Sequence, residues 1–104
     1  MPNALRLQSF ALNEHGDALL RQGAMAQALA AYEEGLEIAR DLAARDPTNV
    51  QFARDVVVSL FRVAAAGARP WAEVVAAFDG LKARGIFDPN HQDAYDFARS
   101  QATP

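Results

Sequence analysis

The chain has 104 residues, which is the length of one small domain or of two to three short helical repeats. Alanine accounts for 23 residues and Val, Ile, Leu and Phe together for 25, so the sequence predicts a small core. The net charge of −3 argues against a protein that coats nucleic acid, and the absence of cysteine excludes disulfides and thiol chemistry.

The hydropathy of the chain predicts no membrane segment. No apolar run approaches the roughly 18 residues that a spanning helix needs, and we expect no membrane partner. The N-terminal segment carries polar side chains at Arg6, Ser9 and Asn13, where a signal peptide has a continuous apolar run. These features predict a cytoplasmic protein.

Helix-breaking residues divide the chain into five segments that are rich in strong helix formers. None of the five shows the alternation of apolar and polar residues that marks a half-buried strand. The sequence therefore predicts an all-α fold. The four boundaries lie at Gly23, at Asp46-Pro47, at Gly67 with Pro70, and at Gly85 with Asp88-Pro89.

The first two predicted helices are the longest. One runs over about residues 4–22, with Asn3 as its expected N-cap and Gly23 as the residue that ends it. The other runs over about residues 25–45 and carries an apolar stripe at helical spacing. This stripe comprises Met25, Ala28, Leu29, Tyr32, Leu36, Ala39 and Leu42.

Three shorter helices are predicted to follow. A broadly apolar helix covers about residues 49–66, and Thr48 and Gln51 before and within it have the spacing of a capping box. The next helix covers about residues 70–84, and the last covers about residues 88–101. The apolar stripe of the last helix consists of Ala94, Phe97 and Ala98.

An internal repeat links these helices. Residues 28–33 (ALAAYE) resemble residues 74–79 (VVAAFD), and each block opens the second helix of a pair. An Asp-Pro step precedes a helix at residues 46–47 and again at residues 88–89. The repeating unit is therefore a helix, a short turn, a second helix and an Asp-Pro break, and the chain holds two units and a final helix.

The first unit carries a set of small, aliphatic and aromatic residues at characteristic positions. They are Leu12, Gly16, Leu19, Gly23, Ala28, Leu29, Tyr32, Gly35, Leu36 and Asp46-Pro47. With this set the chain resembles the tetratricopeptide repeat (TPR) family, and particularly its long-helix bacterial members. The resemblance implies that Gly16 and Ala28 lie where paired helices cross closely, and that Tyr32 packs between helices.

The resemblance also implies an architecture. The chain would form one domain, a right-handed helical solenoid of five helices. Its two helix-turn-helix pairs would cover about residues 4–46 and 48–85, and a capping helix would cover about residues 88–101. The resemblance is strong over residues 9–49 and weaker over residues 50–101.

In TPR proteins the first helix of each pair lines a concave surface, so the resemblance selects candidate partner-binding residues. They are Phe10, Asn13, Asp17 and Leu20 in the first predicted helix, and Val58, Phe61, Arg62 and Ala65 in the third. The apolar members need a cover, because exposed apolar patches favour association. The cover is a partner helix, an extended peptide or a second copy of the chain; alternatively, the side chains pack against one another.

The sequence offers no constellation for catalysis. His15 has no second metal ligand three or four residues away, and His91 is expected to cap or to lie on the surface of the last helix. There is no strand-turn-helix serine motif and no glycine-rich phosphate loop. We therefore predict that the protein is not an enzyme and holds no cofactor or metal.

Two functions remain open from the sequence. The first is a protein–protein interaction module that binds a peptide or a partner helix in the concave groove. The alternative is a structural role, either self-association as a homo-oligomer or a place within a longer TPR array. Two and a half repeats are close to the smallest stable solenoid, which makes a homodimer a serious alternative.

Overall fold

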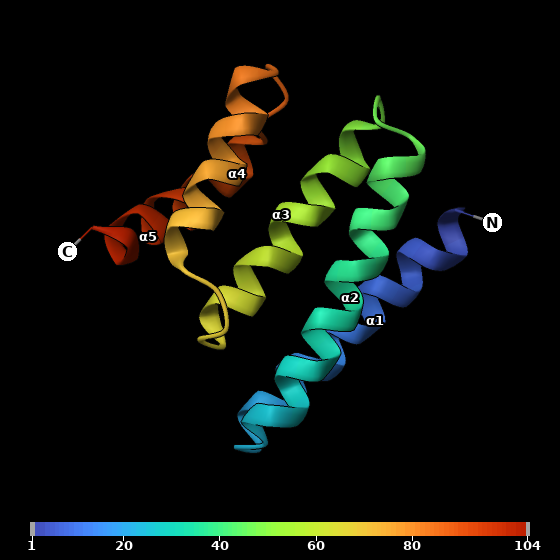
Figure 1. Ribbon diagram of the computed structural model, residues 1–104, viewed down its shortest axis with the longest axis vertical. Helices are drawn as coiled ribbons and strands as arrows, with labels where there is room; N and C mark the ends of the chain where they lie inside the picture. The colour runs from blue at the N-terminus through green and yellow to red at the C-terminus, as the bar shows by residue number, and fades with distance from the viewer. Residues whose placement is uncertain (1, 104) are drawn as a thin grey trace.

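The chain folds into helices alone in the computed structural model, which describes residues 2–103 (Figure 1). Five α-helices follow one another, and a short 3-10 helix, η1, precedes the last. No strand occurs within residues 2–103, so the prediction of an all-α fold is confirmed. The elements are α1 (Pro2–Arg21), α2 (Met25–Arg45), α3 (Val50–Ala65), α4 (Trp71–Ala83), η1 (Pro89–His91) and α5 (Gln92–Ala102).

Three glycines end helices at the predicted positions. Gly23, Gly67 and Gly85 follow α1, α3 and α4 with φ of 79°, 86° and 71°, a left-handed conformation that glycine adopts without steric cost. Helix α2 has no such glycine and ends before Asp46-Pro47, where proline cannot continue the helical ladder. The chain reverses after each helix, and successive helices run roughly antiparallel (Figure 1).

Helix α2 begins at Met25 as predicted, whereas the starts of α1, α3 and the last helix differ from prediction. Asn49 caps α3, because its side-chain oxygen accepts a hydrogen bond from the backbone N–H of Phe52 at 3.0 Å. Thr48, the expected cap, donates to Asp46 instead. Helix α1 begins at Pro2, and the side chain of its expected cap, Asn3, lies outside the described residues. The last predicted helix is divided into η1 and α5.

Helices α1 and α2 meet most closely at two glycines. A Cβ atom on Gly16 would lie 2.5 Å from the ring of Tyr32, and one on Gly35 would lie 2.9 Å from Oδ1 of Asn13. Gly16, which the TPR resemblance assigned to a helix crossing, therefore lies where only a residue without a side chain fits. The second small residue of that assignment, Ala28, is fully buried.

One apolar core runs through α2, α3, α4 and α5, and the partly buried Leu19 and Leu20 of α1 pack against it. Its buried members come from all four helices, as expected if each apolar stripe faces a neighbouring helix. They are Ala28, Tyr32, Leu36, Val57, Leu60, Val63, Ala64, Val74, Phe78, Leu81, Tyr95 and Ala98.

The inner face of α5 differs from the predicted stripe. Ala98 is buried as expected, but Phe97 is 48% exposed, and Tyr95 is buried in its place. The ring of Tyr95 packs edge-on against Phe78 at 5.6 Å, and its hydroxyl donates to Asp79 at 2.5 Å. Tyr95 therefore fixes the rotation of α5 on α4, because a buried tyrosine must also place its hydroxyl on an acceptor.

Polar contacts join α1 to α3. Three pairs lie at successive levels along the two helices: Arg6 with Asp55 at 2.7 Å, Asn13 with Ser59 at 3.2 Å, and Asp17 with Arg62 at 3.2 Å. The middle pair is closed to solvent, since Asn13 and Ser59 are 4% and 1% exposed. This polar seam holds the first pair of helices against α3 on the side that carries the candidate site.

Candidate functional site

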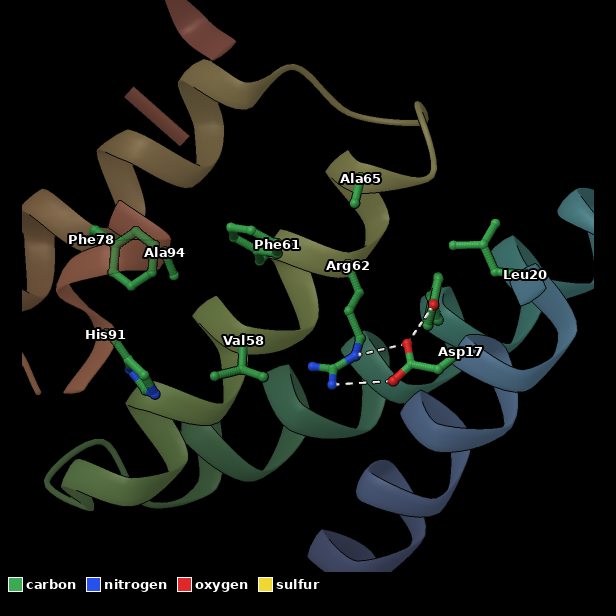
Figure 2. Close-up of a pocket in the computed structure, with 10 residues that line it drawn as sticks. Asp17, Leu20, Val58, Phe61, Arg62, Ala65, Phe78, His91 and Ala94 are labelled. Carbon is green, nitrogen blue, oxygen red and sulfur yellow. Dashed lines mark hydrogen bonds and ion pairs between the residues drawn. The ribbon is translucent and has the colours of Figure 1, made fainter. Parts of the chain in front are cut away.

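A pocket of about 400 Å³ opens between α1, α3 and the η1–α5 segment (Figure 2). Residues of α2 and α4 contribute to its walls, which are mostly apolar. The lining residues are Asp17, Leu20, Tyr32, Val58, Phe61, Arg62, Ala65, Phe78, His91 and Ala94. The volume of the pocket lies within the range of about 300–1,000 Å³ that is typical of ligand sites, which have mostly apolar walls and a few polar groups.

The structure brings six of the eight predicted groove residues together in this pocket. They are Asp17, Leu20, Val58, Phe61, Arg62 and Ala65. The remaining two, Phe10 and Asn13, lie elsewhere on α1. The α1 residues that line the pocket therefore lie in the second half of that helix.

Asn13 is part of the α1–α3 seam and is closed to any partner. Its Nδ2 donates to the hydroxyl of Ser59 at 3.2 Å, and the side chain is buried between the two helices. Phe10 also lies outside the pocket, because its ring faces the guanidinium of Arg6 at 4.6 Å. Arg6 in turn is held by Asp55. The structure therefore places Asn13 in the buried α1–α3 seam and Phe10 outside the pocket.

Four lining residues were missed by the sequence analysis. Tyr32 belongs to the apolar stripe of the second predicted helix, and Phe78 is its counterpart in the repeated block 74–79; both line the pocket in the structure. Ala94 and His91 belong to the last predicted helix, which was assigned a capping role. The rule that the first helix of each unit lines the groove, applied to this helix as well, would have drawn attention to both.

Asp17 is the most heavily hydrogen-bonded side chain of the pocket. Its Oδ1 accepts from the hydroxyl of Tyr32 at 2.5 Å and from Nε of Arg62 at 3.2 Å, and its Oδ2 accepts from Nη2 of Arg62 at 3.4 Å. Burial alone would raise the pKa of Asp17, but these hydrogen bonds and the positive charge of Arg62 outweigh it and lower the pKa. Asp17 is therefore a fixed carboxylate.

Tyr32 shows the opposite shift. Burial, together with its hydrogen bond to Asp17 and the negative charge of that carboxylate, raises the pKa of Tyr32 to about 12. The phenol stays protonated at neutral pH and continues to donate to Asp17. The two residues thus form a static link between α1 and α2, which suits a binding surface better than proton transfer.

An aromatic cluster extends the pocket to the edge of the molecule. Phe61 lines the pocket and also packs edge-on against Trp71, with ring centres 5.0 Å apart. Phe97 lies 6.0 Å from Phe61 and 5.3 Å from Trp71. Because Phe97 is exposed, the apolar surface runs continuously from the pocket to the outer side of α5.

Within residues 2–103, no group of three or more His, Asp or Glu side chains is placed to hold a metal ion. The same part of the chain contains no helix that is both long and apolar enough to cross a membrane. The chain was also compared with protein-family models, curated proteins and solved structures, and none of the three comparisons finds a match.

Proposed function

We propose that this chain is a non-catalytic protein-interaction module that binds a peptide or a partner helix in the pocket between α1, α3 and α5. The observation that carries the proposal is that most of the predicted groove residues lie together in one pocket. Six residues that the TPR resemblance selected for a groove, from the first and third predicted helices, line one apolar pocket. Such a pocket gains binding free energy by burying apolar side chains of a partner, at roughly 25 cal/mol per Å².

We further propose that the helices form a TPR-like solenoid, in which α1, α3 and α5 are the first helices of successive units. Two features support this arrangement. The pocket takes residues from all three of these helices and from η1, which directly precedes α5. Gly16, which the TPR resemblance assigns to a close helix crossing, also lies at a close contact between α1 and α2, against the ring of Tyr32.

Self-association is the second candidate, and one observation favours it. Phe97 is one of the most exposed large apolar side chains of the described chain, and it adjoins Trp71 and the pocket through Phe61. A second copy of the chain is a chemically suitable cover for such a surface, because homodimer interfaces are rich in aromatic residues.

The test of the proposed function is a pair of groove variants. Phe61→Glu places a charge at the centre of the apolar surface, and Ala65→Glu places one at an exposed position on the rim. We expect both variants to keep their helical circular dichroism and to lose binding of peptides selected from a random display library. Leu7→Glu, on an exposed part of α1 away from the pocket, is the matched control and should bind like the wild type.

The outcomes separate the two candidates. A monomeric wild type that enriches peptides, which the groove variants do not retain, supports a peptide-binding module. A wild-type dimer that dissociates in Phe61→Glu and Ala65→Glu, measured by sedimentation equilibrium, supports self-association instead. If Ala65→Glu folds and binds like the wild type, the pocket is not the binding site. Because Ala65 is exposed, this variant remains informative even if Phe61→Glu does not fold.

A further inference from the structure

The polar groups of the pocket differ in the hydrogen-bonding capacity that they have left for a ligand. Both carboxylate oxygens of Asp17 already accept hydrogen bonds, and the only donor of the Tyr32 hydroxyl is used on Asp17. The Tyr32 hydroxyl therefore has no proton left for a ligand, and Asp17 has only part of Oδ2 left as an acceptor. The side chains with unused donor capacity are Arg62 and His91.

Arg62 uses only part of its hydrogen-bonding capacity within the chain. It uses Nε and Nη2 on Asp17, and its third nitrogen, Nη1, has no hydrogen-bond partner among residues 2–103. The side chain is 31% exposed, so this group is accessible from the pocket. Guanidinium groups only donate and stay charged at any physiological pH, and Nη1 therefore needs an acceptor.

His91 faces the same space from the opposite wall. Its backbone N–H bonds to the carbonyl of Asp88, and its ring lies 6.4 Å from that of Phe78. The imidazole nitrogens have no hydrogen-bond partner in the described part of the chain. Figure 2 shows the side chains of Arg62 and His91 on either side of Val58, so two nitrogen groups flank an apolar floor.

The charges around this floor favour an anion. Arg62 and Asp17 cancel one another, and Arg21 lies close enough to Asp17 to help lower its pKa. Arg54 lies one turn before Val58 on α3 and is held by the carbonyl of Ile86 at 2.8 Å.

Two further carboxylates, Asp55 on α3 and Asp88 directly before η1, make hydrogen bonds within the chain. Asp55 is paired with Arg6 at 2.7 Å. Asp88 accepts from the backbone N–H of Asn90 at 2.9 Å. The charged side chains named around the pocket are four arginines (Arg6, Arg21, Arg54 and Arg62) and three aspartates (Asp17, Asp55 and Asp88), so their sum is +1, although the chain as a whole carries −3.

We infer that the pocket selects an acidic amphipathic peptide segment, in which an apolar side chain enters against Phe61 and Val58 and a neighbouring Asp or Glu carboxylate binds Arg62. This inference rests on the proposed function and names the chemistry of its ligand. A basic segment would meet Arg62 with no free carboxylate in the pocket. A neutral amide would accept the same hydrogen bonds without the gain that a charged acceptor gives.

The test begins with a random peptide display library, panned on the full chain without counter-selection on a charged variant, and the recovered peptides are then measured against Ala65→Glu. We expect the recovered sequences to combine an apolar residue with Asp or Glu at a fixed spacing. A recovered peptide is then synthesised together with its Glu→Gln or Asp→Asn counterpart. We expect the acidic form to bind about tenfold more tightly, the gain of one charge-assisted hydrogen bond, and this preference to shrink in high salt.

Variants of the Asp17–Arg62 ion pair test whether Arg62 causes the preference for the acidic peptide. Asp17→Asn leaves Arg62 free, and the preference for the acidic peptide should persist or increase. In the Asp17→Asn/Arg62→Gln double variant the apolar walls remain, and the preference should disappear. The double variant avoids leaving the carboxylate of Asp17 without its partner.

The results that would contradict this inference differ from those that would contradict the proposed function. Recovery of apolar peptides with no acidic bias, or with a basic bias, overturns this inference and leaves the proposed function standing. Recovery of no peptide beyond those that Ala65→Glu retains overturns both. A preference for the acidic form that survives in the double variant shows that the carboxylate binds somewhere other than Arg62, which also overturns the inference.

Discussion

The ring of Tyr32 lies directly on the backbone of Gly16, so that a Cβ atom at residue 16 would stand 2.5 Å from two carbons of the ring. Tyr32 is 2% exposed, and its hydroxyl is bonded to Asp17, the residue that follows Gly16 along α1. One side chain of α2 therefore sets the distance to α1 and orients a carboxylate of the pocket. The fold and the candidate site are coupled at this contact.

Gly16→Ala should destabilise the protein. Alanine is the better helix former by about 1 kcal/mol, but the added methyl group displaces a buried ring that cannot move without breaking its bond to Asp17, so we expect a net loss of about 1–2 kcal/mol. Chemical denaturation measures the difference. Gly80→Ala is the control, because a Cβ atom at residue 80 would have no atom within 4 Å of it. That variant should gain about 0.5–1 kcal/mol. Equal gains in both variants would show that Tyr32 does not constrain residue 16.

Arg6→Gln should cost more than an ordinary ion-pair substitution. Its partner Asp55 has a side chain that is only 9% exposed, and removal of the cation leaves that carboxylate without its charged partner. We expect a loss of about 1–3 kcal/mol in the free energy of unfolding. Arg45→Gln breaks the solvent-exposed pair with Asp41 and should change stability by less than about 0.5 kcal/mol. A similar small effect in both variants would mean that the seam contributes little.

The helices could be predicted well because their ends are local features. Glycine in a left-handed conformation and the Asp46-Pro47 step stop a helix whatever its neighbours are. The face that a short helix buries is not local. In α5, both a stripe with Phe97 and a stripe with Tyr95 have helical spacing, and hydrophobicity alone favours Phe97. In the structure Tyr95 is the buried residue, because its hydroxyl reaches Asp79 while its ring packs on Phe78.

The same difference between local and non-local features explains which residues of the candidate site could be predicted from the sequence. The TPR resemblance placed Asn13 and Asp17 on one side of the first helix, and both side chains contact α3. It could not show that the α1–α3 contact is buried at Asn13 and Ser59 but open to solvent at Asp17 and Arg62, because this depends on how the two helices cross. The contribution of His91 was also beyond periodicity, since η1 reaches the pocket only through its packing on α4.

Ala28→Leu should be strongly destabilising. Ala28 is fully buried in the core of α2, and a larger side chain forces neighbouring helices apart, so we expect a loss of about 1–3 kcal/mol. Leucine is itself a good helix former, and propensity cannot account for such a loss. Ala26→Leu, at an exposed position of the same helix, should stay within about 0.5 kcal/mol of the wild type. If Ala28→Leu unfolds at the same denaturant concentration as this control, residue 28 does not lie at a tight crossing.

Tyr32 should ionise unusually late as the pH rises. The two tyrosines can be separated, because Tyr95→Phe leaves Tyr32 as the single tyrosine of the chain. In that variant, the tyrosinate absorbance should appear with a midpoint near pH 12, against an ordinary pKa of 10.0. Circular dichroism over the same range must show that the helices are intact. A midpoint near pH 10 in a folded variant would contradict the hydrogen bond to Asp17.

The same shift makes stability depend on pH in a defined direction. The pKa of Tyr32 is higher in the folded protein than in the unfolded chain, so the folded state holds the phenolic proton more tightly. The resulting stabilisation is complete below pH 10 and is lost as the pH rises from 10 towards 12. Urea denaturation of Tyr95→Phe at several pH values in this window should show the decline. In a Tyr32→Phe/Tyr95→Phe variant, which has no phenol to ionise, the decline should be shallower, and an equal slope in both would assign it to other groups.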